Sequence, residues 1–453
     1  NFVETNDQVL ESEENSVSLT VSGPVRITWN WDFIPVEWQI PLDVDRGQSE
    51  VPFYVDLARS PDTSSPWICY QDIAAKDLHV VFYSVDQWVN QNLDSFGEVG
   101  AFCNLKVDDM GDVHMAYYDE TNQTLKVAER IRGVWNINTA DPNQGNGRYC
   151  SISGSPEGKW GIAYLDNSNL AQPVVKYAQK FQNDWLIEQA RQFDGVVEYL
   201  QLIYYNEEPL IVFYDATAGQ LKYLYYDGEW ILDTIDSTPD VGRFCHAALD
   251  PNTGQPAVAY YDLTNSRLKY AIRRPDFTWN IQVVDDTGDV GYYPNLVFDK
   301  SGKPNISYQD LGKQRLKFAT FDGIFWQISV IDSAPGNTTW YPALAKYLDE
   351  EFSIAYLVNS EVKYLSSRKF VDPENYETGG GGGCFIATAA FGSLMTASVE
   401  ELTSLRDGSV LSSTTGAGLV QLYYGVSPEP AHAEGRSPAF SALVRDWLSG
   451  LYR

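Results

Sequence analysis

The chain is poor in basic residues, in histidine and in long apolar runs. Its 453 residues include 32 Lys and Arg against 61 Asp and Glu, which gives a formal net charge of -29. This balance argues against nucleic acid and anionic membrane surfaces as partners, because both bind clustered Lys and Arg. Only 4 His are present, so few residues are suited to general-base catalysis. No apolar run reaches the roughly eighteen residues that a transmembrane helix needs.

Cysteine is also scarce and shows no metal-binding or disulfide spacing. The five cysteines are Cys69, Cys103, Cys150, Cys245 and Cys384, and none belongs to a CxxC motif or a zinc-ligand cluster. No glycine-rich phosphate loop and no nucleophile elbow occur. Two acidic segments, at residues 108–112 and 285–289, lack the EF-hand spacing, and the first coincides with a hairpin turn where Asp and Gly are expected; a weak surface calcium site is the alternative. We therefore expect no metal, no cofactor and no catalytic residue set.

What the chain does have is an internal repeat marked by tryptophan. The mark recurs seven times at intervals of 45–50 residues, at Trp38, Trp88, Trp135, Trp185, Trp230, Trp279 and Trp326. Each unit contains four short alternating runs separated by turn residues, which predict four antiparallel strands. In the fifth unit these are residues 244–250, 256–262, 268–273 and 279–285. Four strands repeated at this period are typical of β-propeller blades.

The two ends of the repeat region complete each other. The unit around Tyr341 has three strands but no Trp strand after it, whereas residues 36–45 match a Trp strand and precede the first full unit. We therefore predict an all-β seven-bladed β-propeller over residues 36–370, in which the N-terminal strand closes the last blade.

The innermost strand of each blade is expected to begin with an aromatic residue. These are Tyr54, Phe102, Tyr149, Tyr199, Phe244, Tyr293 and Tyr341. Two positions further on, a polar residue recurs in six of the seven blades, at Asp56, Asn104, Ser151, Gln201, His246 and Asn295. It lies on the aromatic's side of the strand, so we predict that these side chains line the central channel. They either hold water there or contact a ligand.

A Tyr-x-Asp motif and a following Lys recur as scaffold features. The motif is represented by Tyr117 with Asp119 and by Tyr308 with Asp310, and the Lys by Lys126 and Lys317. A catalytic carboxylate would be present once rather than in six copies. We expect the repeated Asp to accept backbone N–H bonds in the next turn, with the Lys on the other side of its strand.

The entrances of the inner strands carry the candidate ligand-binding residues. These are Arg148, Arg243 and Glu198, beside Tyr292 and Trp340. Two arginines and a glutamate on blades three, five and four suit an acidic or sugar ligand. The Ser-x-Asp-x-Gly-x-x-Trp boxes of sialidases are missing, so these residues do not make a catalytic constellation.

The ends of the chain differ from the repeats. We interpret residues 1–35 as an extension with a loose acidic start and two surplus strands within residues 16–31. These strands either cover a blade edge or pair with a neighbouring molecule. Residues 371–383 form a glycine-rich linker, and the apolar period then changes from two to about 3.6. Residues 384–453 are therefore expected to form a small helical module whose apolar faces dock on a partner.

This last segment resembles a known module. The strings "CFIATAAFGS", "LRDG", "GLVQLYYGVSP" and "ALVRDWL" are similar to the CFI-box domain, which closes many exported bacterial proteins after a glycine-rich tether. Cys384, Phe385 and Ile386 carry the head of the motif, and we interpret Cys384 as a packing residue rather than a nucleophile. The repeats resemble secreted bacterial repeats rich in "YYD" and "LKYA". The resemblance implies an exported, cell-surface protein, and the start at Asn1 rather than Met leads us to expect a removed signal peptide.

Two hypotheses for function follow. The first is a non-catalytic extracellular scaffold or interaction protein, in one version a filament subunit that self-associates through residues 384–453 and 1–31. The second is a carbohydrate-binding or sialidase-like hydrolytic propeller with its ligand at the inner-strand face.

Overall fold

The structure is a computed structural model that describes residues 2–5, 8–11, 38, 41–46, 53–61, 64–72, 74–84, 87–333, 341–347, 351–358 and 361–367. The chain divides into two units, Asn1–Phe370 and Val371–Arg453. The strands expected within residues 16–31, the linker 371–383 and the module 384–453 lie outside the described residues. So do Cys384, Phe385 and Ile386.

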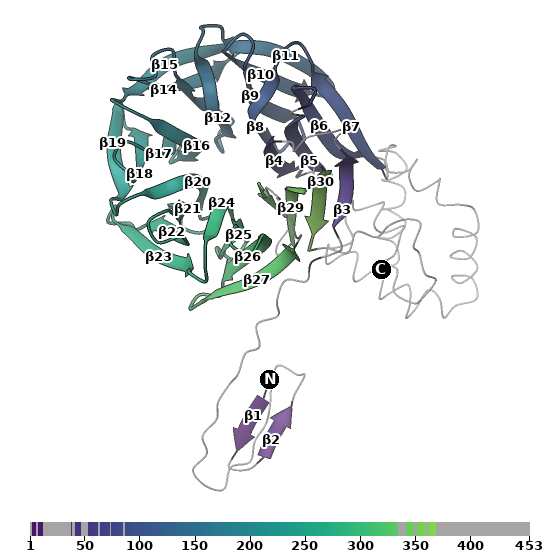
Figure 1. Ribbon diagram of the computed structural model, residues 1–453, viewed down its shortest axis with the longest axis vertical. Helices are drawn as coiled ribbons and strands as arrows, with labels where there is room; N and C mark the ends of the chain where they lie inside the picture. The colour runs from purple at the N-terminus through teal and green to yellow at the C-terminus, as the bar shows by residue number, and fades with distance from the viewer. Residues whose placement is uncertain are drawn as a thin grey trace, which may run out of the picture. The chain divides into compact units, whose positions relative to one another are not determined.

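The repeat region forms seven four-stranded antiparallel sheets around a common axis (Figure 1). From the innermost strand outward, blades 1 and 2 are β4 Phe53–Arg59, β5 Pro66–Asp72, β6 Asp77–Ser84 and β7 Gln87–Asp94, then β8 Val99–Val107, β9 Val113–Asp119, β10 Thr124–Ile131 and β11 Val134–Asp141. Blades 3 and 4 are β12 Asn146–Gly154, β13 Trp160–Asp166, β14 Val174–Phe181 and β15 Asp184–Gln192, then β16 Val197–Tyr205, β17 Glu208–Asp215, β18 Gln220–Tyr226 and β19 Trp230–Asp236. Blades 5 and 6 are β20 Val241–Leu249, β21 Pro256–Asp262, β22 Arg267–Arg273 and β23 Trp279–Asp285, then β24 Val290–Phe298, β25 Pro304–Asp310, β26 Arg315–Phe321 and β27 Trp326–Ser333. The predicted all-β seven-bladed propeller is confirmed.

Blade 7 is completed by the N-terminal strand, as the repeat predicts. It is built from β28 Ala343–Tyr347, β29 Glu351–Val358, β30 Glu361–Ser366 and β3 Leu42–Arg46. Strand β3 pairs antiparallel with β30, and Lys363 forms an ion pair with Asp43 at 3.0 Å. One apolar cluster contains Val44 and Leu57 together with Ala355, so blades 7 and 1 share a core. The ring is therefore closed by strand exchange between the two ends of the repeat region.

The acidic start of the chain differs from the expectation of a loose segment. Strands β1 Phe2–Thr5 and β2 Gln8–Glu11 form a two-stranded antiparallel sheet. In the register of this pair Val3 lies opposite Leu10 and Phe2 opposite Glu11.

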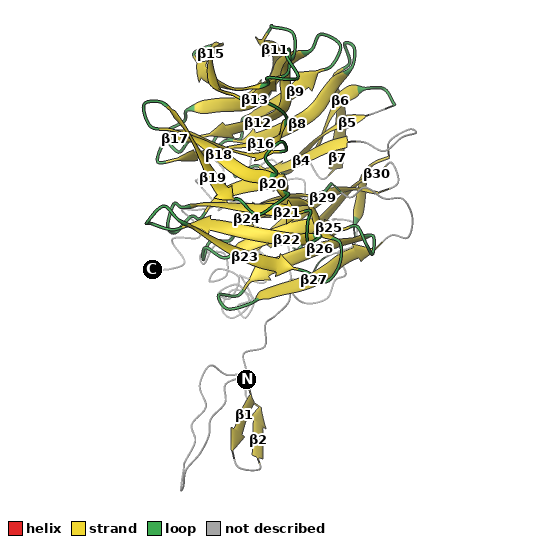
Figure 2. Ribbon diagram, turned by 60° about the vertical axis from the view of Figure 1, so that its left-hand side comes forward, coloured by secondary structure: helices red, strands yellow, loops and turns green. Residues whose placement is uncertain are grey.

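The core lies between neighbouring blades. The second strand of a blade is buried on both faces: all seven residues of β9 are buried, whereas exposed residues recur along the outer strand β11. Side chains of adjacent sheets interdigitate, so each apolar cluster joins two consecutive blades, as sheet packing requires. Among the described residues the elements are strands joined by loops (Figure 2). No helix in this described part is long and apolar enough to cross a membrane.

The repeated Tyr and Lys link blades 2, 3, 5 and 6 to the blade before each of them. Tyr308 of blade 6 donates a hydrogen bond to Asp285 at the end of the outer strand of blade 5, at 2.6 Å, and Lys317 pairs with the same carboxylate at 2.8 Å. The same Tyr–Asp–Lys contact recurs at Tyr117, Asp94 and Lys126; at Tyr164, Asp141 and Lys176; and at Tyr260, Asp236 and Lys269. The Asp of the motif itself, such as Asp310, accepts the backbone N–H of the next turn, as predicted. These residues are structural.

Candidate functional site

The aromatic residue of each innermost strand adopts a left-handed backbone conformation. The φ angles lie between 31° and 59° at Tyr54, Phe102, Tyr149, Tyr199, Phe244, Tyr293 and Tyr341. In blades 1 to 6 the pairing with the second strand shifts register across this residue, so it belongs to a β-bulge that re-aims its side chain. Left-handed geometry is unfavourable for bulky side chains and costs about 1–3 kcal/mol at each position.

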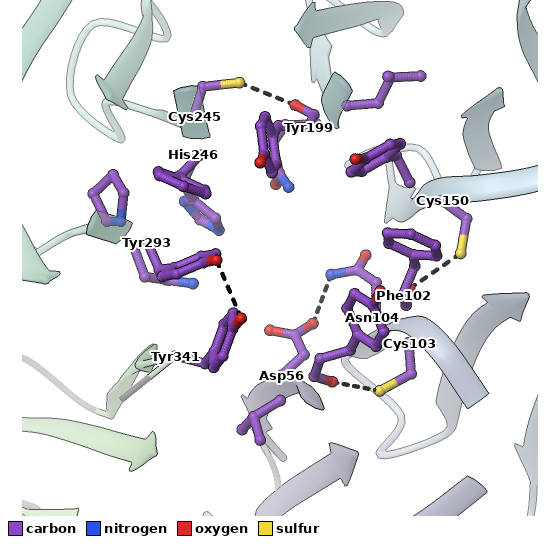
Figure 3. A pocket seen from close by; sticks show the side chains of 18 of the residues that line it. Asp56, Phe102, Cys103, Asn104, Cys150, Tyr199, Cys245, His246, Tyr293 and Tyr341 are labelled. Carbon is purple, nitrogen blue, oxygen red and sulfur yellow. Dashed lines mark hydrogen bonds between the residues drawn. The ribbon is translucent and has the colours of Figure 1, made fainter. Parts of the chain in front are cut away.

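These seven residues form what we call the aromatic belt. Six consecutive pairs of rings have centroids 4.1–5.3 Å apart, with interplanar angles of 42–67°. The hydroxyl groups of Tyr293 and Tyr341 are 3.1 Å apart and point into the central cavity (Figure 3). The rings thus make a continuous run of tilted and edge-to-face contacts around the axis, and five of the seven carry a hydroxyl group.

A cavity of about 420 Å³ lies inside the belt. All seven belt residues line it, together with Arg148 and five of the six polar residues predicted to face the channel, namely Asp56, Asn104, Gln201, His246 and Asn295. Ser151, the sixth, occupies the same register position in blade 3 but is buried against the next blade.

Four of the polar residues hold adjacent blades together. Asp56 accepts the N–H of Leu105 at 2.8 Å, and Asn104 accepts that of Ile152 at 2.8 Å. Ser151 and His246 accept the equivalent N–H groups of Leu202 and Leu296. In every case the donor follows the polar position of the next blade by one residue. The recurrence of this polar position was evident in the sequence, but its bond to the next blade was not predicted.

Gln201 and Asn295 differ from the other polar residues. Both line the cavity, and neither side chain has a hydrogen bond with the part of the chain that the structure describes. Their amides are therefore available to a ligand without loss of a bond between blades.

The polar groups in the cavity are mostly neutral at physiological pH. Burial raises the pKa of Tyr54 to about 12 and also raises that of Tyr199, so both hydroxyls stay protonated. Burial and the nearby ammonium of Lys106 lower the pKa of His246 to about 3. Because its Nδ1 accepts the N–H of Leu296, the neutral ring carries its proton on Nε2. The cavity therefore offers neutral donors and acceptors, with Asp56 as the carboxylate among its lining residues.

Three cysteines stabilise the belt backbone. The thiols of Cys103, Cys150 and Cys245 donate hydrogen bonds to the carbonyls of the belt residues Tyr54, Phe102 and Tyr199 in the preceding blade. Burial raises the pKa of all three thiols. A protonated, buried thiol is a poor nucleophile, so these cysteines are packing residues.

Four of the five predicted ligand residues lie in described strands. Each comes one residue before the belt residue of its blade. Arg148 stacks over Tyr118, and Arg243 over Tyr214, with guanidinium-to-ring distances of 5.9 and 5.6 Å. Glu198 lies between them in blade 4 and accepts a hydrogen bond from the belt residue Tyr149. The remaining two are Tyr292, which stacks on Tyr261 at 4.3 Å, and Trp340, which lies outside the described residues. We call Arg148, Glu198, Arg243 and Tyr292 the rim.

The described residues hold no group of three or more His, Cys, Asp or Glu side chains that could bind a metal ion. In the acidic turn at residues 108–112, Asp108 accepts the N–H groups of Met110 and Asp112, as a hairpin turn requires.

No family model matches the chain, and no curated protein matches it in sequence. Solved structures resemble it at low identity. AofleA from Arthrobotrys oligospora is 12% identical, with 66% of this chain and 90% of that chain covered and a TM-score of 0.43. The SapL1 lectin, solved with alpha methyl fucoside, is 10% identical over 65% of this chain and 100% of that chain, with a TM-score of 0.46. The Hadza microbial sialidase Hz136 is 12% identical over 80% and 72%, with a TM-score of 0.44. Identities this low concern the fold alone.

Proposed function

We propose that the propeller is a non-catalytic carbohydrate-binding module and that the end of a glycan enters the cavity inside the aromatic belt. The belt carries this proposal, because seven bulky residues in a left-handed conformation are a costly way to build a packed core. Backbone strain of this kind persists where the surrounding structure enforces it, and it concentrates at binding sites. The same side chains packed with relaxed geometry would fill the channel without the strain.

The chemistry of the cavity favours a sugar over an ion. Its walls combine aromatic rings with neutral hydroxyls and the amides of Gln201 and Asn295, which match the apolar faces and hydroxyl groups of a saccharide. The one lining carboxylate, Asp56, already accepts two hydrogen bonds, from Leu105 and Asn104. A cavity of about 420 Å³ falls within the range of small-molecule sites, which is roughly 300–1,000 Å³.

The absence of catalysis is part of the proposal. Glycoside hydrolysis commonly uses two carboxyl groups on either side of the scissile bond. Among the four rim residues Glu198 is the one carboxylate, Asp289 beside the rim accepts a hydrogen bond from Tyr261, and Asp56 is engaged in holding blade 2. His246 is neutral, and its low pKa makes it a weak base.

The proposal is tested by a glycan array followed by calorimetric titration of the tightest ligand. Tyr199→Phe removes one hydroxyl while keeping the ring, and Phe already occupies the same position in blades 2 and 5. Loss of one neutral hydrogen bond, about 0.5–1.5 kcal/mol, should raise Kd roughly threefold to tenfold. Gln201→Trp should fill the cavity and abolish binding without removing a bond between blades. Tyr226→Phe, at a residue that does not line the cavity, is the matched control. Absence of any glycan ligand, or unchanged binding by Gln201→Trp, would contradict the proposal.

We further propose that the module acts outside a bacterial cell and is attached there through residues 384–453. Support comes from the resemblance of that segment to the CFI-box domain. Self-association through residues 384–453 and 1–31 is a second proposal, motivated by the apolar helical pattern of the first segment and the strand pattern of the other. Deletion of residues 379–453 should leave a soluble propeller that binds sugar but no longer assembles. Light scattering that gives one particle size for intact and truncated protein would count against assembly.

A further inference from the structure

The rim contains a cation, Arg148, that has no hydrogen-bond or ion-pair partner among the described residues. Arg148 lies on the innermost strand β12, one residue before the belt residue Tyr149, and it lines the cavity. Its Nε is buried without a hydrogen-bond partner, and its guanidinium has no hydrogen bond or ion pair with any described residue. Its guanidinium stacks over Tyr118. A buried N–H group without a hydrogen-bond acceptor is unfavourable, so the site is incomplete as it stands.

Arg243 provides an internal comparison. It has the same register position in blade 5 and stacks over Tyr214 in the same way. A hydrogen bond to Tyr214 raises its pKa, and the hydroxyl of Tyr199 and the carboxylate of Glu198 raise it further. Arg243 does not line the cavity. The Nε of Arg243 is also buried without a hydrogen-bond partner, so the feature that distinguishes Arg148 is that it lines the cavity.

We propose that Arg148 determines specificity by binding a carboxylate on the sugar, so that the preferred ligand is an acidic saccharide such as a uronic acid. This inference rests on the proposed sugar site. Guanidinium and carboxylate match in shape and form two parallel N–H···O bonds. The carboxylate is placed at the rim, because Arg148 lies there, one residue before the belt residue Tyr149. The hydroxyl groups of the same sugar then face the belt and the amides of Gln201 and Asn295.

The test compares methyl glycosides of glucose, galactose and mannose with the corresponding methyl uronosides, titrated against the full chain. Wild-type protein should bind at least one uronoside about tenfold or more tightly than its neutral counterpart, since a charge-assisted pair is roughly twice as strong as a neutral hydrogen bond. Raising the ionic strength should reduce that preference. Arg148→Gln should remove the preference by weakening uronoside binding to the level of the matched neutral glycoside. Arg148→Lys should keep part of it, and Arg243→Gln should keep most of it.

The outcomes separate the two proposals. If neutral glycosides bind but the uronosides bind no better, or if the preference survives Arg148→Gln, the role of Arg148 is wrong and the sugar site stands. If neither set binds, both proposals fail. If Arg148→Gln does not fold, the test uses the uronoside preference of Arg148→Lys and the salt dependence of that preference in the wild-type protein. A preference that is unchanged in Arg148→Lys and unchanged by salt would overturn the role of Arg148.

Discussion

The contact between blades 5 and 6 should be sensitive to the loss of one negative charge. Asp285 is 1% exposed and receives hydrogen bonds from Tyr308, Lys317 and Thr287. Replacing it with Asn keeps the shape but leaves the ammonium of Lys317 buried with only Asp310, at 3.4 Å, as an anionic partner. Removing one partner of a buried ion pair costs about 3–5 kcal/mol. Because Asp310 remains, we expect the lower end, about 3 kcal/mol.

Differential scanning calorimetry measures this loss. At about 2 °C per kcal/mol for a chain of this size, Asp285→Asn should lower Tm by roughly 6 °C. The neighbouring Asp286 is exposed, so Asp286→Asn is the matched control and should change Tm by less than about 1 °C. The double variant Asp285→Asn with Lys317→Met removes the cation as well and should recover part of the loss, limited because Asp310 then loses its partner Lys317. If Asp285→Asn unfolds within 1 °C of the control, the Tyr–Asp–Lys contact does not hold the blades together.

Three further predictions concern the belt and the closure. At the belt residue Phe102, the Gly variant should have a free energy of unfolding about 1 kcal/mol higher than the Ala variant, measured with urea, because φ is 54° there. A Gly variant less stable than the Ala variant would show that the position is unstrained. The pKa of His246 is lowered from 6.5 to about 3, so the folded state binds fewer protons and stability should decrease by about 1.4 kcal/mol per pH unit as pH falls from 6.5. His246→Gln, which keeps an acceptor for Leu296, should remove that slope between pH 6.5 and 4, and an unaltered slope would assign it to other groups. Deletion of residues 1–35 should leave Tm nearly unchanged, whereas deletion of 1–46 removes β3 and should cause cooperative loss of the propeller; equal stability of the two would contradict closure by β3.

The repeat made the architecture predictable. The repeated Trp positions and the unmatched strand at residues 36–45 predicted seven blades and their closure. This was possible because each repeat unit folds locally into the same four-stranded sheet. The belt residues and the polar position after them were also identified, since strand alternation determines which residues share a face.

Contacts between blades were not predicted, because their partners are distant in sequence and come from different units. Asp285 at the end of an outer strand meets Tyr308, which is 23 residues later, and the equivalent pair Asp94 and Tyr117 has the same separation. That recurring spacing was a usable signal. The left-handed geometry at Tyr199 had no signal in the sequence, because no residue type predicts a strained bulge. The unpartnered state of Arg148 likewise depends on packing that only the folded ring reveals.

The central claim is that a sugar binds inside the aromatic belt. The most direct test is a crystal structure of the propeller with the tightest glycan from the array. We expect a sugar ring within the cavity, in contact with Tyr199, Tyr293 and Gln201, with its acidic group at Arg148. A glycan bound on the outer strands, with the cavity holding only water, would contradict it.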